Sequence, residues 1–215
     1  LLMKYLYPTL ILLLALLILP IQMVQAQNWS RLRSVPTSAF IPVLWDGAIS
    51  CTAWRLNPTI LITVDHCATD GEGQDIDQVT TPDGVLKVIA RDHEQDLAAI
   101  ETPVSHDANL LPSDIPLPVG QPVAAIGYGG GNPTPVYTFG VVSNPLMKIL
   151  VNPTFAVDGL IIYGGFVSGM SGGPIQNEDG LVVGVVKATG PPMGIYQDIG
   201  VGVPQEVFLK FLKGL

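Results

Sequence analysis

Short apolar runs separated by turn-forming residues constrain the fold of this chain more than any other feature. Gly (23 residues) and Pro (19 residues) punctuate the sequence, and charged residues make up only 13% of it. Turn sequences such as 82–84 (Pro-Asp-Gly) and 178–180 (Glu-Asp-Gly) stand between the runs. Many short strands joined by such turns are typical of an all-β domain. The predicted strands lie at 47–54, 59–64, 85–91, 97–101, 121–128, 136–143, 159–163, 181–188 and 197–203.

These strands are predicted to close into two small β-barrels, an arrangement that leaves no exposed sheet edge. The first barrel is expected at about 40–110 and the second at about 118–203, with the proline-rich stretch 110–122 crossing between them. The segment 204–213 (PQEVFLKFLK) differs from the rest. Proline suits a first helical turn, and the apolar residues recur at helical spacing, so a short C-terminal helix is predicted there.

The N-terminal segment reads as a signal peptide. Lys4 precedes the apolar run 10–19, Pro20 follows it, and Val24-Gln25-Ala26 offers a cleavage site. Cleavage after Ala26 leaves 27–215 as a single protein domain, which predicts a secreted, periplasmic or otherwise extracellular location. The alternative is a membrane anchor, because 5–24 approaches the roughly 20 apolar residues that span a bilayer.

Charge and cysteine content narrow the possible partners. Ten basic against 18 acidic residues give a formal charge of -8, which disfavours nucleic acid. Cys51 and Cys67 are the only cysteines. An even pair behind an export signal predicts a disulfide, worth about 3 kcal/mol for a loop of this length. Two cysteines and one adjacent histidine leave a structural zinc short of ligands, so no metal is expected.

The most specific motif is 169–174, Gly-Met-Ser-Gly-Gly-Pro, between two apolar runs. Glycines on both sides of Ser171 permit a tight turn and a close approach of substrate to the main chain. Ser171 is therefore the candidate nucleophile. The main-chain N–H groups of Gly169 and Ser171 are the candidate oxyanion hole, which stabilises the developing charge in acyl transfer.

A serine hydroxyl is a weak nucleophile and needs a base within hydrogen-bond reach. His66 ends an apolar run and precedes Cys67, so a disulfide would fix the loop that presents it. His93 and His106 stand in charged or loop-like surroundings, which indicates solvated surface histidines. His66 is the predicted general base.

The base in turn needs a carboxylate that orients the imidazole and stabilises the imidazolium. Asp96 begins the run 96–100 (Asp-Leu-Ala-Ala-Ile), where a buried charge demands a partner. Asp65 points to another side of its strand if that segment is extended, and Asp92 lies in a charged turn. Asp96 is therefore the predicted orienting residue.

The ordered motifs around His66, Asp96 and Ser171 resemble those of trypsin-like (chymotrypsin-fold) serine peptidases over about 43–213. The resemblance implies two six-stranded antiparallel barrels with a C-terminal helix, and a disulfide beside the histidine. It also implies a serine endopeptidase that acts through an acyl-enzyme on protein or peptide substrates. No cofactor is implied, and a monomer is expected.

Two departures from that family affect activation and specificity. Many relatives carry an aspartate before the serine, which receives a newly cut N-terminus; here Met170 stands there, so the oxyanion loop is predicted not to depend on N-terminal processing. The resemblance places the base of the specificity pocket at Gly165 and the substrate-pairing segment at Lys187, Ala188 and Thr189. Without an acidic residue at Gly165, an uncharged side chain is favoured over Arg or Lys, and Lys187 offers an alternative preference for an acidic one.

Three other functions remain open at this stage. A hydrophobic segment ahead of a serine protease domain also fits a viral polyprotein-processing protease with a membrane anchor. A protease fold without activity would be a binding protein, which would need a broken triad or a blocked oxyanion loop, but all three triad residues and both flanking glycines are present. A serine triad can also hydrolyse non-peptide esters.

Overall fold

The computed structural model describes residues 35–103, 107–152, 155–189 and 198–215. The predicted signal or anchor helix and His106 lie outside these residues. Within them, no helix combines the length and the hydrophobicity needed to cross a membrane.

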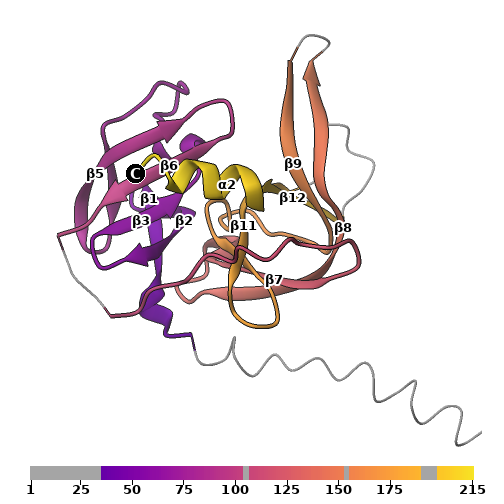
Figure 1. Ribbon diagram of the computed structural model, residues 1–215. Helices are drawn as coiled ribbons and strands as arrows, with labels where there is room; N and C mark the ends of the chain where they lie inside the picture. The colour runs from indigo at the N-terminus through magenta and orange to yellow at the C-terminus, as the bar shows by residue number, and fades with distance from the viewer. Residues whose placement is uncertain (1–34, 104–106, 153–154, 190–197) are drawn as a thin grey trace, which may run out of the picture.

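Six antiparallel strands close into the first barrel, shown in indigo to magenta in Figure 1. Their order around the barrel is β1-β2-β3-β6-β5-β4, and pairing of Leu44 with Thr80 joins β1 to β4. The strands are β1 (Phe40–Trp45), β2 (Ala48–Asn57), β3 (Ile60–Thr63), β4 (Gln78–Thr81), β5 (Gly84–Asp92) and β6 (Leu97–Glu101). Short 3-10 helices precede β1 (η2, Thr37–Ala39) and follow β3 (η3, Asp65–Ala68).

A second closed barrel follows, in the order β10-β11-β12-β9-β8-β7. Its strands are β7 (Pro122–Gly127), β8 (Val136–Asn152), β9 (Phe155–Tyr163), β10 (Pro174–Gln176), β11 (Val182–Thr189) and β12 (Ile199–Pro204). The 3-10 helix η4 (Gly129–Gly131) follows β7. The upper parts of β8 and β9 project from the barrel as a hairpin (Figure 1). The predicted pair of six-stranded barrels is confirmed.

The predicted C-terminal helix is also confirmed, as α2 (Gln205–Leu212). It follows β12 but packs back on the first barrel, because the ring of Phe208 lies edge-on to Trp54 of β2 at 5.7 Å between centroids. Both side chains are fully buried. Their core also contains Val185 and Val203 of the second barrel, so the two barrels share one apolar interior where they meet.

Three strands were not predicted: β1, β4 and β10. Each is short or poorly patterned, since β1 contains a proline, β4 reads Gln-Val-Thr-Thr and β10 has three residues. These three strands form because neighbouring strands supply hydrogen-bond partners for their backbone, and their own β-propensity is weak. Strands β8 and β9 extend beyond the predicted ranges. A register shift between Asn144 and Met147 accommodates Pro145 within β8.

Candidate functional site

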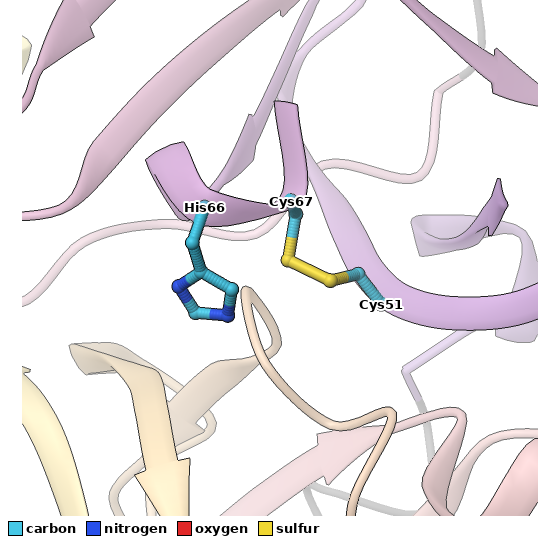
Figure 2. A group of neighbouring side chains, drawn as sticks. All are labelled: Cys51, His66 and Cys67. Carbon is cyan, nitrogen blue, oxygen red and sulfur yellow. A yellow bond between two sulfur atoms is a disulfide. The ribbon is translucent and has the colours of Figure 1, made fainter. Parts of the chain in front are cut away.

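The first barrel presents His66 on the 3-10 helix η3, directly after β3. The neighbouring Cys67 forms a disulfide with Cys51 of β2, with the two Cα atoms 6.0 Å apart. In Figure 2 the ring of His66 and the disulfide descend from the same short turn, and the ring points toward the paler orange and yellow ribbon of the second barrel. The disulfide therefore fixes the backbone that carries the imidazole.

Asp96 holds His66 through both its side chain and its main chain. Nδ1 of His66 lies 3.0 Å from Oδ2 and 3.1 Å from Oδ1 of Asp96, and the main-chain N–H of His66 donates to Oδ1 at 3.0 Å. A carboxylate only accepts hydrogen bonds, so Nδ1 carries the proton and Nε2 is left as the acceptor. The Asp96 side chain is 15% exposed and that of His66 is 47% exposed, which leaves the imidazole accessible to a substrate.

Asp65 turns away from this pair, though for a reason other than the expected one. The segment 65–68 is a 3-10 helix and not an extended strand. Asp65 Oδ1 accepts from Arg91 Nη1 at 2.6 Å, and Arg91 also donates to the carbonyls of Ala68 and Ile76. The Arg91 guanidinium therefore holds η3, the turn that carries His66, through Asp65 and the Ala68 carbonyl.

His93 was predicted as a solvated surface histidine, and the structure places it at the surface beside an acidic partner. Its side chain is 62% exposed, but Nδ1 lies 2.8 Å from Asp65 Oδ2. The hydrogen bond that His93 donates to Asp65, with the charges of Asp65 and Asp75, raises the pKa of His93. Nearby charge in the folded protein supplied a partner that the local sequence did not indicate.

Two groups of side chains in the described part of the chain have spacing that could suit a metal ion. In the first, Cys51, His66 and Cys67, both sulfur atoms are already joined in the disulfide. In the second, Asp65, Asp75 and His93, the guanidinium of Arg91 lies against both carboxylates and supplies the positive charge. Neither donor set is therefore arranged for a cation.

The loop that bears Ser171 belongs to the second barrel but is held by the first. Thr52 of β2 donates its N–H to the Ser171 carbonyl at 2.8 Å and its Oγ1–H to the Gly169 carbonyl at 2.8 Å. Gly172 N–H donates to the Val186 carbonyl of β11 at 2.8 Å. The loop therefore lies at the junction of the two barrels, on the side where His66 and its disulfide face it.

The hydroxyl of Ser171 donates to the carbonyl of Lys187 at 3.4 Å. No hydrogen bond joins it to His66 among the described residues. In unliganded enzymes such catalytic hydrogen bonds are often long and form only with substrate. A rotation about the Cα–Cβ bond of Ser171 is what would redirect the hydroxyl.

Two main-chain N–H groups of this loop, those of Gly169 and Ser171, make up the predicted oxyanion hole. Gly130 N–H donates to the Ser168 carbonyl at 2.7 Å. In a trans peptide the carbonyl and the following N–H point in opposite directions, so this bond turns the N–H of Gly169 away from η4. Within the described chain, neither that N–H nor the N–H of Ser171 has a hydrogen-bond acceptor, which suits an oxyanion hole.

Met170 anchors the loop without using charge. Its side chain is fully buried, its N–H donates to the Val167 carbonyl at 3.0 Å, and its Sδ accepts from Val167 N–H at 3.4 Å. The hydroxyl of Thr138 lies 4.0 Å from the same sulfur. The buried side chain of Met170 thus fixes the backbone of its neighbours Gly169 and Ser171.

The residues predicted to bind substrate lie in two regions, with Gly165, Ala188 and Thr189 in one and the side chain of Lys187 in the other. Gly165 follows β9, and the adjacent Phe166 packs its ring on Gly200 of β12. The main chain of Thr189 pairs with Gly200 and that of Ala188 with Val201, so these residues border the same region. The Lys187 side chain does not join them, because Nζ donates to the Gln95 carbonyl at 3.4 Å.

Sequence reasoning missed Thr52, Arg91 and Gly130, which hold the loops of the site. Each contacts a residue distant in sequence, up to 117 positions for Thr52 and Gly169. A hydroxyl beside Cys51 and an arginine in a strand carry no local signal that would have revealed them.

The chain belongs to the family of proteins with a trypsin-like peptidase domain, whose profile matches residues 51–185, more than half of its length. It is similar to a probable periplasmic serine endoprotease, DegP-like, of Rickettsia prowazekii (strain Madrid E). The two are 29% identical over 168 residues, which cover 73% of this chain and 31% of that protein. The chain thus spans about a third of the length of this curated relative.

Solved structures show the same fold at lower identity. The active form of the Rv3671c protease from M. tuberculosis superposes with a TM-score of 0.69 at 18% identity, covering 87% of this chain and 84% of that one. The HtrA-type protease AlgW with a tripeptide gives a TM-score of 0.69 at 19% identity, covering 86% and 62%. These likenesses extend the fold assignment over most of the described chain.

Proposed function

We propose that this protein is a serine endopeptidase whose triad is His66, Asp96 and Ser171. The observation that carries the proposal is the pairing of Nδ1 of His66 with both oxygens of Asp96 at 3.0 and 3.1 Å. That pairing leaves Nε2 as a base facing a serine loop with two free N–H groups. Membership of the trypsin-like family and the similarity to a DegP-like endoprotease support the same activity.

The proposed reaction proceeds through an acyl-enzyme. Nε2 of His66 accepts the Ser171 Oγ–H proton as Oγ bonds to the substrate carbonyl carbon, and the resulting oxyanion binds the N–H groups of Gly169 and Ser171. Asp96 stabilises the imidazolium. The carbon–nitrogen bond breaks as His66 returns the proton to the leaving amine. Water then bonds to the acyl carbon as His66 takes its proton, the carbon–Oγ bond breaks, and His66 returns that proton to Oγ, which releases the acid and restores Ser171.

The substrate is proposed to be a protein or peptide with an uncharged side chain at the primary pocket. Gly165 contributes no charge there, and the ring of Phe166 fills space against Gly200. Lys187 directs its ammonium to Gln95, which does not favour the alternative of an acidic preference. The solved AlgW protein was obtained with a tripeptide, in keeping with peptide binding by this fold.

The proposed location is the extracellular or periplasmic side of a membrane. The disulfide between Cys51 and Cys67 suits an oxidising compartment, and the DegP-like relative is described as periplasmic. We retain 1–26 as the proposed signal peptide, 27–215 as the proposed protease domain, and a monomer as the proposed state.

Labelling with a fluorophosphonate probe tests the activity. The oxidised protein is expected to form a covalent adduct at Ser171, identified by peptide mass mapping, because the probe reacts with an activated serine. Ser171→Ala and His66→Ala are the matched controls, and both are expected to lose the adduct. A folded wild-type protein that remains unlabelled would contradict the proposal and favour a non-catalytic binding protein.

Activity is expected without cleavage at the N-terminus. Met170 is buried and cannot accept an ion pair from an ammonium group, so the loop needs no new terminus. The measurement is the labelling rate of protein whose N-terminus has been determined by intact mass, before and after limited proteolysis. Equal rates are expected. Labelling that appears only with a new N-terminus within 27–45 would contradict this prediction.

A further inference from the structure

Lys187 is the extra residue of a β-bulge in β11. Val186 pairs with Gly202 of β12 and Ala188 pairs with Val201, so Lys187 falls between two successive pairs of the ladder. A bulge re-aims the side chain of its extra residue and is common beside active sites. The carbonyl of Lys187 accepts from Ser171 Oγ at 3.4 Å. One end of this residue therefore touches the candidate nucleophile.

The other end of Lys187 reaches the first barrel beside Asp96. Nζ donates to the carbonyl of Gln95, the residue before Asp96, at 3.4 Å. Asp96 has φ of 61°, a left-handed conformation that few residues other than Gly, Asn and Asp adopt. Oε1 of Gln95 is buried without a hydrogen-bond partner in the described part of the chain. Lys187 of the second barrel thus contacts the turn of the first barrel that carries Asp96.

The ammonium occupies a site that is unfavourable for charge. Burial lowers the pKa of Lys187, and the carboxylates of Asp96, Asp92 and Asp158 oppose that shift only in part. A group whose pKa is lower in the folded state destabilises the fold while it is charged, and this cost falls as pH rises through that pKa. Packing stability alone does not explain a lysine here, because an apolar side chain would be at least as stable.

We propose that Lys187 is a positioning residue of the triad, which ties the Gln95–Asp96 turn to the serine strand and places a positive charge beside Asp96. The inference rests on the proposed function. A positive charge near the Asp96–His66 pair disfavours a second positive charge on the imidazole.

Other charges around His66 are the same in wild type and in a Lys187 variant, so they cancel in the comparison. Asp96 pairs with the imidazole directly, and Asp65 is adjacent in sequence and paired with Arg91 and His93. The remaining charged groups linked to these residues are Asp75, Asp92, Asp158 and Lys148.

Lys187→Met separates this role from simple packing. The acid limb of the kcat/KM profile is expected to move about one unit to higher pH, and kcat is expected to fall about tenfold. The thermal midpoint is expected to be equal or higher, because a partly buried charge is lost. Lys187→Arg should restore most of the wild-type profile. Lys210→Met removes an equal charge from the exposed face of α2 and is expected to leave the profile unchanged.

An NMR titration of the His66 ring gives a readout that does not require turnover. Its midpoint is expected to move in the same direction in Lys187→Met. A labelled, active wild type with an unchanged midpoint in the variant would overturn the inference and leave the proposed function standing. An inactive wild type with a shifted midpoint would overturn the proposed function and leave the electrostatic role of Lys187 standing. Absence of both would overturn both.

Discussion

Asp96→Asn is expected to lower kcat/KM about ten thousandfold with the fold intact. Asn tolerates the left-handed conformation that Asp96 adopts at φ 61°, so the backbone of the turn should persist. An amide cannot reproduce two acceptor oxygens toward Nδ1 of His66, which lies 3.0 Å from one and 3.1 Å from the other. If the amide nitrogen faces Nδ1, the ring adopts the tautomer whose Nε2 is already protonated and cannot serve as a base. Hydrolysis of a peptide substrate, measured beside circular dichroism, checks both parts.

Asp92→Asn is the matched control, because it removes the same charge near the same turn. Oδ1 of Asp92 accepts from Gln95 N–H at 3.0 Å, and an asparagine oxygen can keep that bond. Activity is expected to stay within about threefold of wild type, since this carboxylate has no bond to the imidazole. A comparable loss in both variants would mean that the net charge of the turn matters and that the specific contact of Asp96 does not.

Gly172→Ala is expected to destabilise the protein by about 4 kcal/mol, enough to leave little folded protein at ordinary temperatures. A Cβ at this position would lie 2.1 Å from the Thr52 carbonyl oxygen and 2.2 Å from Thr63 Oγ1. The φ of 85° adds strain for any side chain. Thr63 cannot move freely, because its hydroxyl donates to the same Thr52 carbonyl at 2.8 Å. Urea unfolding measures the loss.

Gly120→Ala controls for backbone strain. Gly120 has φ of 84°, nearly the same as Gly172, but a Cβ there would meet nothing within 4 Å. A loss of about 1 kcal/mol is expected. Equal losses in the two variants would show that backbone conformation dominates and that the close contact with the first barrel does not. The difference between them measures how tightly the serine loop is packed on β2.

The two-barrel architecture was accessible from the sequence because turn residues and apolar runs are local signals. The helix at the C-terminus was accessible for the same reason, since Pro204 and Phe208 lie within one short periodic segment. The strands that escaped prediction, such as β4 and β10, form only because a neighbouring strand supplies their hydrogen bonds. The assignment of catalytic roles to His66, Asp96 and Ser171 stays a prediction, with the His66–Asp96 geometry in its favour.

The sequence alone determined which residues could carry chemistry, because a serine among glycines, a histidine beside a cysteine and an aspartate opening an apolar run are recognisable within a few positions. Only the tertiary structure decided how they are supported. Thr52 reaches Gly169 across 117 positions, and Lys187 reaches Gln95 across 92. Such contacts depend on how two closed barrels meet. The direction of the Lys187 side chain is set by its partner in the other barrel, and that of the Ser168–Gly169 peptide by Gly130. No local sequence pattern encodes either direction.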